Sequence, residues 1–206
     1  MPRESVQGHE AGACRHRIKA SRRFVVVSSS ASFARNGPIR RYRRSMKPVK
    51  TSRQLSPQAS LEEVVGRMPA LARVIANSCL TPLMEQHPYL RAISSDDWDF
   101  FVPIGAVHAG MERLRITVRD PERIDALNGV LTSSLGDWET NAPRALRDCE
   151  QFVLKAPDKV LLFDAIAAWV LWNVFRRQPT DAEFRVAPVL GVIFREFSRD
   201  LTSTTA

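Results

Sequence analysis

Apolar residues after Ser60 recur at intervals of three and four, the spacing that places them on one face of an α-helix. The longest stripe begins at Phe100, and its members are separated by four, three, four, three and four residues in turn. They are Phe100, Ile104, Val107, Met111, Leu114 and Val118. The same spacing recurs before and after this stripe, so the pattern predicts a succession of amphipathic helices.

Helix ends are marked by residues that satisfy free backbone groups. Ser60 to Glu63 and Thr180 to Glu183 both have the spacing of a capping box, in which a hydroxyl and a glutamate cap the first turn reciprocally. Asp120 followed by Pro121 is typical of an N-cap and a first helical residue. Gly136 predicts a helix end, because glycine adopts the left-handed cap conformation without strain.

Prolines divide the predicted helices, since proline lacks the N–H that the interior of an α-helix uses. We expect a kink or a short break at Pro69. Pro103 is expected to interrupt or begin the helix that carries the longest stripe. Pro188 is expected to bend the terminal helix.

The segment from Val160 to Phe175 differs from the others, because it is apolar around almost its whole circumference. Such a segment is either a central core helix or a membrane span. Its 16 residues are fewer than the roughly twenty that cross the hydrocarbon of a bilayer. Asp164 and Asn173 also interrupt the apolar run. The pattern therefore favours a core helix and argues against a membrane partner.

The end of the longest stripe has two interpretations. Leu114, Ile116 and Val118 alternate with polar residues, as they would in an exposed strand. A lone strand would leave backbone groups unpaired, so a helix is favoured. The sequence thus predicts an all-α globular bundle of about six helices around a central apolar helix. An α+β fold with a short strand near 113–119 is the alternative.

Charge is divided unevenly along the 206 residues of the chain. Residues 1–55 hold 14 Lys or Arg and 2 Asp or Glu, a net charge of +12, whereas residues 56–206 hold 16 and 20, a net charge of −4. The overall charge of +8 therefore belongs to the N-terminal segment. We divide the chain into a basic arm, residues 1–57, and a helical globular domain, residues 58–202.

The basic arm is rich in arginine and serine and has no acidic residue between Arg15 and Lys50. This composition predicts disorder, because too little apolar surface can be buried to offset the ordering entropy. The composition also resembles that of an organellar transit peptide. Alternatively, translation begins at Met46, which would remove most of the positive charge.

One cluster in the basic arm is the candidate nucleic-acid contact. Its members are Arg40, Arg41, Tyr42, Arg43 and Arg44. Arginine binds phosphates through counterion release without reading the bases, and the tyrosine ring could stack on one base. A solvated tail is the favoured interpretation, and nucleic-acid binding is the alternative.

No nucleotide-binding loop, hydrolase motif or metal-binding motif occurs in the chain, so the candidates for catalysis are single residues. His108 has Glu112 four positions on and Asp97 eleven positions back. On a continuous helix the three would align, and a histidine paired with a carboxylate can act as a general base or a metal ligand. Pro103 disturbs that alignment, so a surface pair of His108 with Glu112 is favoured.

Asp164 is the second candidate, because a carboxylate inside an apolar helix is costly unless it is paired or protonated. We favour a structural pair with an arginine from another helix. A pocket beside Trp169 or Trp172 is the alternative. The sequence predicts no cofactor and no bound metal.

The three cysteines, Cys14, Cys79 and Cys149, are far apart and have no metal-ligand spacing. We expect buried thiols in a reducing, cytosol-like compartment, with organellar targeting by the arm as the alternative.

These features predict a non-catalytic protein-interaction or regulatory module, whose partner is another protein or a second copy of the chain. Nucleic-acid association through residues 1–55 is the first alternative. The second is a small ligand-binding or metal-dependent enzyme that uses His108 with Glu112, or Asp164.

Overall fold

The computed structural model of the chain describes residues 60–203. No strand occurs among these residues, which confirms the predicted all-α fold class. Their elements in chain order are α2 (Leu61–Gln86), the 3-10 helix η2 (Pro88–Ala92), α3 (Ser95–Thr117), α4 (Pro121–Trp138), α5 (Ala142–Leu154), α6 (Leu162–Val174), the single-turn α7 (Asp181–Phe184) and α8 (Ala187–Ser203). The predicted disorder of residues 1–57 lies outside the described part of the chain.

The predicted capping residues begin three of these helices. Asp120 accepts hydrogen bonds from the backbone N–H groups of Glu122 and Arg123 at the start of α4. Thr180 and Glu183 form a complete capping box at α7. At α2, Ser60 caps the N–H of Glu63, but the glutamate side chain binds Arg67 at 2.7 Å instead of returning to Ser60.

Prolines and glycines end fewer helices than the sequence predicts. Helix α2 continues through Pro69, so the short break that was one of two expectations there is absent, while the kink stays a prediction. Helix α3 continues through Pro103, which neither interrupts nor begins it. Both prolines are buried, and packing on the flanking turns compensates for the single backbone hydrogen bond that each one removes. Gly136 lies inside α4, which ends at Trp138. Pro188 falls in the first turn of α8, where proline is tolerated.

The strand alternative for residues 113–119 is wrong. Helix α3 extends to Thr117, and the N–H of Val118 still donates to the carbonyl of Leu114. Ile116 is 66% exposed because it lies on the solvent face of this last turn. The alternation of apolar and polar residues was therefore the edge of a helical stripe.

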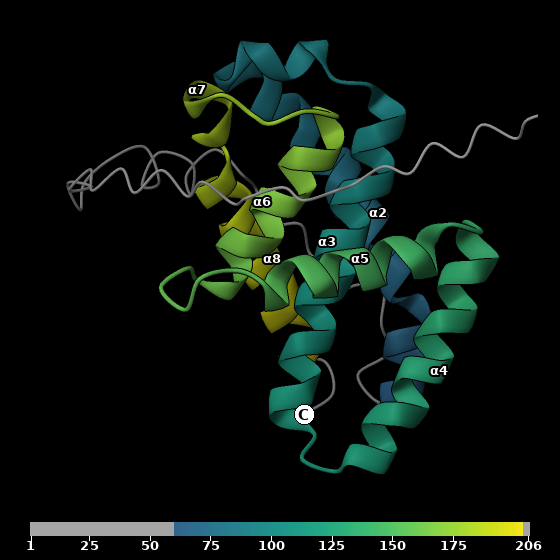
Figure 1. Cartoon of the computed structure of the whole chain (residues 1–206). Coiled ribbons are helices and arrows are strands. Elements are labelled where there is room, and N and C mark those ends of the chain that lie inside the picture. The colour runs from purple at the N-terminus through teal and green to yellow at the C-terminus, as the bar shows by residue number, and fades with distance from the viewer. Residues whose placement is uncertain (1–59, 204–206) are drawn as a thin grey trace, which may run out of the picture. The chain divides into compact units, whose positions relative to one another are not determined.

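Helix α3 occupies the centre of the bundle (Figure 1). It packs extensively against α2, α5, α6 and α8, and every residue from Val102 to Met111 is buried. The segment predicted to be central, 160–175, forms α6, which is a core helix packed against α3 and α8. Charged residues at both ends of α3 lower its mean hydropathy, and this explains why α6 is the more conspicuous helix in the sequence.

Glycines allow α3 to approach its neighbours closely. A Cβ atom at Gly105 would lie 2.8 Å from Val170 of α6 and 3.0 Å from Phe194 of α8. A Cβ atom at Gly110 would lie 2.9 Å from both Leu201 of α8 and Met68 of α2. Close packing of helices accounts for these small residues without a ligand. No helix in the described part of the chain is long and apolar enough to span a membrane.

Candidate functional site

A depression of about 490 Å³ lies where α6 ends beside the start of α3. Its polar lining comes from Ser94, Asp97, Arg176, Arg177 and Glu183. Its apolar lining comes from Ala92, Ile93, Val174 and Phe175. These residues belong to two stretches, 92–97 and 174–183, which are far apart in the sequence and which the fold brings together.

Arg176 is held in an unusual backbone conformation directly after α6. Its φ of 51° makes it the one non-glycine residue with positive φ in the described chain. Helices often end with glycine in this left-handed conformation, and a side chain there is strained. The guanidinium binds Asp97 through two hydrogen bonds of 2.8 Å each. This pair ties the end of α6 to the first turn of α3.

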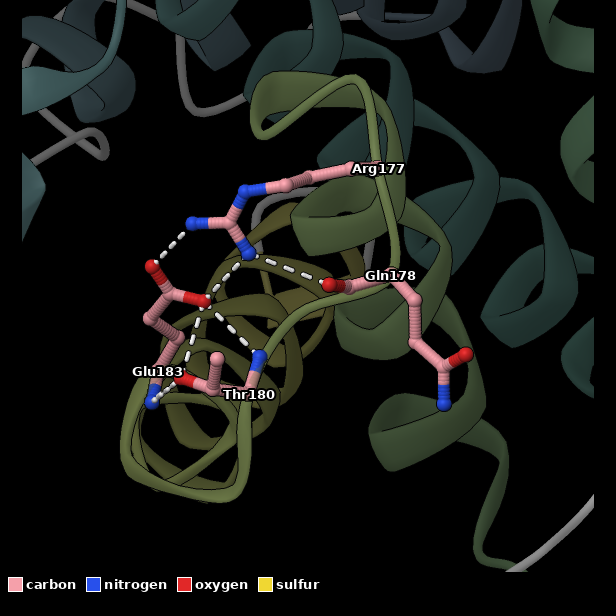
Figure 2. Close-up of polar contacts among 4 residues, drawn as sticks. All are labelled: Arg177, Gln178, Thr180 and Glu183. Atoms are coloured by element: carbon pink, nitrogen blue, oxygen red, sulfur yellow. Dashed lines mark hydrogen bonds and ion pairs between the residues drawn. The ribbon is translucent and has the colours of Figure 1, made fainter.

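Arg177 makes a second bidentate pair, with Glu183 (Figure 2). Two of its nitrogens donate to the glutamate oxygens at 2.6 and 2.8 Å, and one also donates to the backbone carbonyl of Gln178. The N–H and the hydroxyl of Thr180 donate to the same carboxylate. The hydrogen bonds from Arg177, together with those from Thr180, lower the pKa of Glu183 to about 2.

His108 is buried, with 2% of its surface exposed, and is not the surface residue favoured by the sequence. Neither ring nitrogen has a hydrogen-bond partner among the described residues. Burial lowers the pKa of His108 to about 4, although the nearby Glu150 opposes this shift and Arg115 adds to it. The imidazole is therefore neutral near pH 7.

Glu112 does not bind His108. It forms an ion pair with Arg115, which also binds Glu150 of α5 at 3.0 Å. Asp97 lies at the other end of α3 and binds Arg176. The structure therefore does not bring His108 and the two predicted carboxylates together as a general base or a metal site.

Asp164 lies in the first turn of α6, not in the middle of an apolar helix. A carboxylate there faces the positive end of the helix dipole. Its Oδ1 atom lies 2.8 Å from the position that a Cβ of Gly191 would occupy on α8. Partial burial raises the pKa of Asp164, and Arg195 opposes the increase. The depression described above does not include Asp164, Trp169 or Trp172.

The two described cysteines are not activated nucleophiles. Cys79 and Cys149 are buried free thiols, as expected. Burial raises the pKa of Cys79 to about 12 and that of Cys149 well above its ordinary value. Both thiols are therefore protonated near pH 7 and have little nucleophilic character.

The connection between α5 and α6 exposes an unusual apolar surface. The exposed residues from the last residue of α5 to the residue before α6, which we call the connection surface, are Leu154, Lys155, Asp158, Lys159 and Leu161. The two leucines are 77% and 63% exposed. Two backbone turns order the connection, since Ala156 donates to Val153 and Val160 donates to Pro157. Figure 1 shows the connection projecting from the helices.

The cluster from Arg40 to Arg44 that was predicted to contact nucleic acid lies outside the described residues. Within residues 60–203, no group of three or more His, Cys, Asp or Glu side chains is arranged to hold a metal ion. The two features with an unusual geometry, the depression and the connection surface, were both missed in the sequence. The sequence contains no motif that identifies their main residues, which are the adjacent arginines 176 and 177 and the leucines 154 and 161.

The fold and these surfaces define a small helical bundle with paired charges at one end of α6 and exposed leucines before its other end. Comparison with known proteins gave no matching family model, curated protein or solved structure.

Proposed function

We propose that residues 60–203 form a non-catalytic module that binds another protein through the connection surface. The exposure of Leu154 and Leu161 carries this proposal, because they and Ile116 are the most exposed large apolar side chains in the described part of the chain, and only the two leucines flank one connection. Burying a leucine side chain contributes about 1.5–3 kcal/mol. A partner that covers both leucines would therefore gain part of the free energy that offsets the cost of association.

The charges on the connection surface suggest the chemistry of the partner. The connection surface contains two lysines, Lys155 and Lys159, and one acidic residue, Asp158, so its formal net charge is positive. We infer an amphipathic segment of a partner protein, with apolar residues against Leu154 and Leu161 and a carboxylate facing Lys155. Such segments bind through a few apolar anchors, while complementary charge fixes their orientation.

The experiment compares partner binding by the wild type with binding by a Leu154→Ser/Leu161→Ser variant. Ile116→Ser is the matched control, because Ile116 is 66% exposed but lies on α3. Proteins retained by each immobilised full chain are quantified by mass spectrometry. We expect the wild type and the control to retain a protein that has an acidic amphipathic segment, and the double variant to lose it. The melting temperatures of the three chains should be equal. Equal retention of partner proteins by the wild type, the control and the double variant would contradict the proposal. It would also be contradicted if the double variant lost only its binding to a second copy of the chain.

A second proposal concerns nucleic acid and rests on the charge of +12 in residues 1–55. Phosphate contacts by this segment would make binding strongly salt-dependent. We expect the full chain to bind a single-stranded oligonucleotide at low salt, and a chain that begins at Met46 to bind far less. Equal binding by the two chains would exclude this proposal.

We also propose a reducing, cytosol-like compartment, which is supported by the buried free thiols of Cys79 and Cys149. Alkylation of the unfolded native chain, with and without reductant, should give the same mass. A mass difference would show that the cysteines form disulfides in the cell.

A further inference from the structure

We propose that the depression at the end of α6 binds a small organic anion, with its carboxylate or phosphate group held between Arg176 and Arg177. Both arginines line the depression, and Ser94 lines it too. A volume of about 490 Å³ lies within the usual range for small-molecule sites. This site is separate from the connection surface, so the inference is independent of the proposed protein partner.

The two guanidinium groups are oriented in advance. Asp97 and Glu183 each bind one of them through two hydrogen bonds, so neither arginine has to lose side-chain freedom when an anion arrives. The carboxylates are themselves mostly buried, whereas the Arg176 side chain is 76% exposed. The carboxylates therefore support the arginines from beneath and leave the outer edges of the guanidinium groups open.

Unused donors remain on both arginines. A guanidinium has five N–H groups, and Arg176 uses only its Nε and one terminal nitrogen to bind Asp97. The Nε of Arg177 makes no hydrogen bond to any described residue. The hydroxyl of Ser94 caps no backbone group of α3. An oxyanion can therefore accept hydrogen bonds here without displacing either carboxylate.

The rest of the lining restricts the class of ligand. Ile93, Val174 and Phe175 offer apolar surface beside the charged groups, and Arg177 lies over the Phe175 ring at 5.3 Å. The formal charges of the two arginines are balanced by Asp97 and Glu183. Recognition would therefore depend on directed hydrogen bonds and apolar contact more than on net charge, as suits an organic acid or a phosphate ester with an apolar body.

The strained backbone of Arg176 is consistent with a binding role. Glycine would relieve the strain, but it would remove the guanidinium from the depression. Strained residues of this kind often occur where a side chain has to be held at a ligand.

The test is an NMR titration of the ¹⁵N-labelled full chain, with inorganic phosphate in one arm and succinate in the other. We expect saturable shifts of the Arg176 and Arg177 Nε–H signals and of the Ser94 amide in at least one arm. Saturation with phosphate alone would assign a phosphate ligand, and saturation with succinate alone would assign a carboxylate. Linear shifts in both arms, or equal shifts at arginines on other helices, would overturn the proposal.

Two variants distinguish a loss of anion binding from a loss of folding. In Asp97→Asn/Arg176→Gln, two amides replace the ion pair, so the buried carboxylate is not left unpaired. We expect this variant to bind about tenfold more weakly, the effect of losing one charge-assisted contact. Arg123→Gln is the control, since Arg123 is half-exposed and pairs with Glu62 at 3.8 Å on a different part of the bundle. Unchanged affinity in the double variant, or an equal loss in the control, would also overturn the proposal.

Discussion

His108 is the residue whose environment differs most from what its neighbours in the sequence predict. A glutamate four residues on suggested a surface pair, but the ring is buried and neither nitrogen has a partner in the described structure. A buried polar group without a hydrogen bond costs about 1–3 kcal/mol. His108 therefore weakens the core that it occupies.

We predict that His108→Leu is at least as stable as the wild type at pH 7, because leucine fills a similar volume without polar atoms. The wild type should lose stability as the pH falls from 6.5 to about 4, since the unfolded chain takes up a proton that the folded chain excludes. That loss is up to about 3 kcal/mol. Urea unfolding of both proteins at pH 7 and pH 4.5 measures how much the free energy of unfolding of each one changes with pH. An identical change in the two proteins would show that His108 is not buried as described.

The pKa of Glu183 also makes the stability of the fold depend on the pH, through a carboxylate that is stabilised in its charged form. Its folded pKa of about 2 lies below its ordinary value of 4.5, so its contribution to stability is present above pH 4.5 and is lost as the pH falls towards 2. In Arg177→Gln, the strongest partner of the carboxylate is removed, and the pKa of Glu183 should rise by about one unit or more. A carboxyl ¹³C titration reads this pKa directly. An unchanged midpoint in the variant would show that Arg177 does not hold Glu183.

At the scale of helices, the sequence predicted starts better than ends. Caps such as Asp120 are local, because the side chain satisfies N–H groups only two or three residues away. Pro69, Pro103 and Gly136 predicted breaks that tertiary packing overrides. Local chemistry therefore fixes where a helix begins, while packing along its whole length decides whether it continues.

Two glycine substitutions test the close packing of α3. We predict that Gly105→Ala destabilises the protein by about 1–3 kcal/mol, because the added methyl group would overlap Val170 and Phe194. Gly129→Ala on α4 is the matched control. Its Cβ meets nothing within 4 Å, so better helix propensity should stabilise it by about 0.5–1 kcal/mol. Thermal unfolding measures both, and a stabilised Gly105→Ala variant would contradict the packing of α3 against α6 and α8.

At the scale of the whole molecule, hydrophobic spacing was enough to predict the all-α class, because apolar residues recur at helical intervals along the chain after Ser60. The identity of the central helix was not predictable from hydropathy, since charged residues at both ends of α3 lower its mean hydropathy below that of α6. The depression was not predictable either. It requires Asp97 and Arg176 to meet across 79 positions of the chain, and no local pattern encodes that contact.

The exposed leucines of the α5–α6 connection are the strongest argument for an interaction module. Their side chains contribute little to the core, so a serine at either position should leave the fold intact. Under the proposed function, the bundle would be the support that presents the connection surface to a partner.

The most direct measurement of this claim is site-specific photo-crosslinking in cells. A photo-reactive amino acid is placed at position 158 within the connection surface, and at position 123 on α4 in the control chain. We predict a discrete crosslinked species with another protein from position 158, none from position 123, and loss of that species when Leu154 and Leu161 are changed to serine. The same crosslinked species from both positions, or no species from position 158, would contradict it.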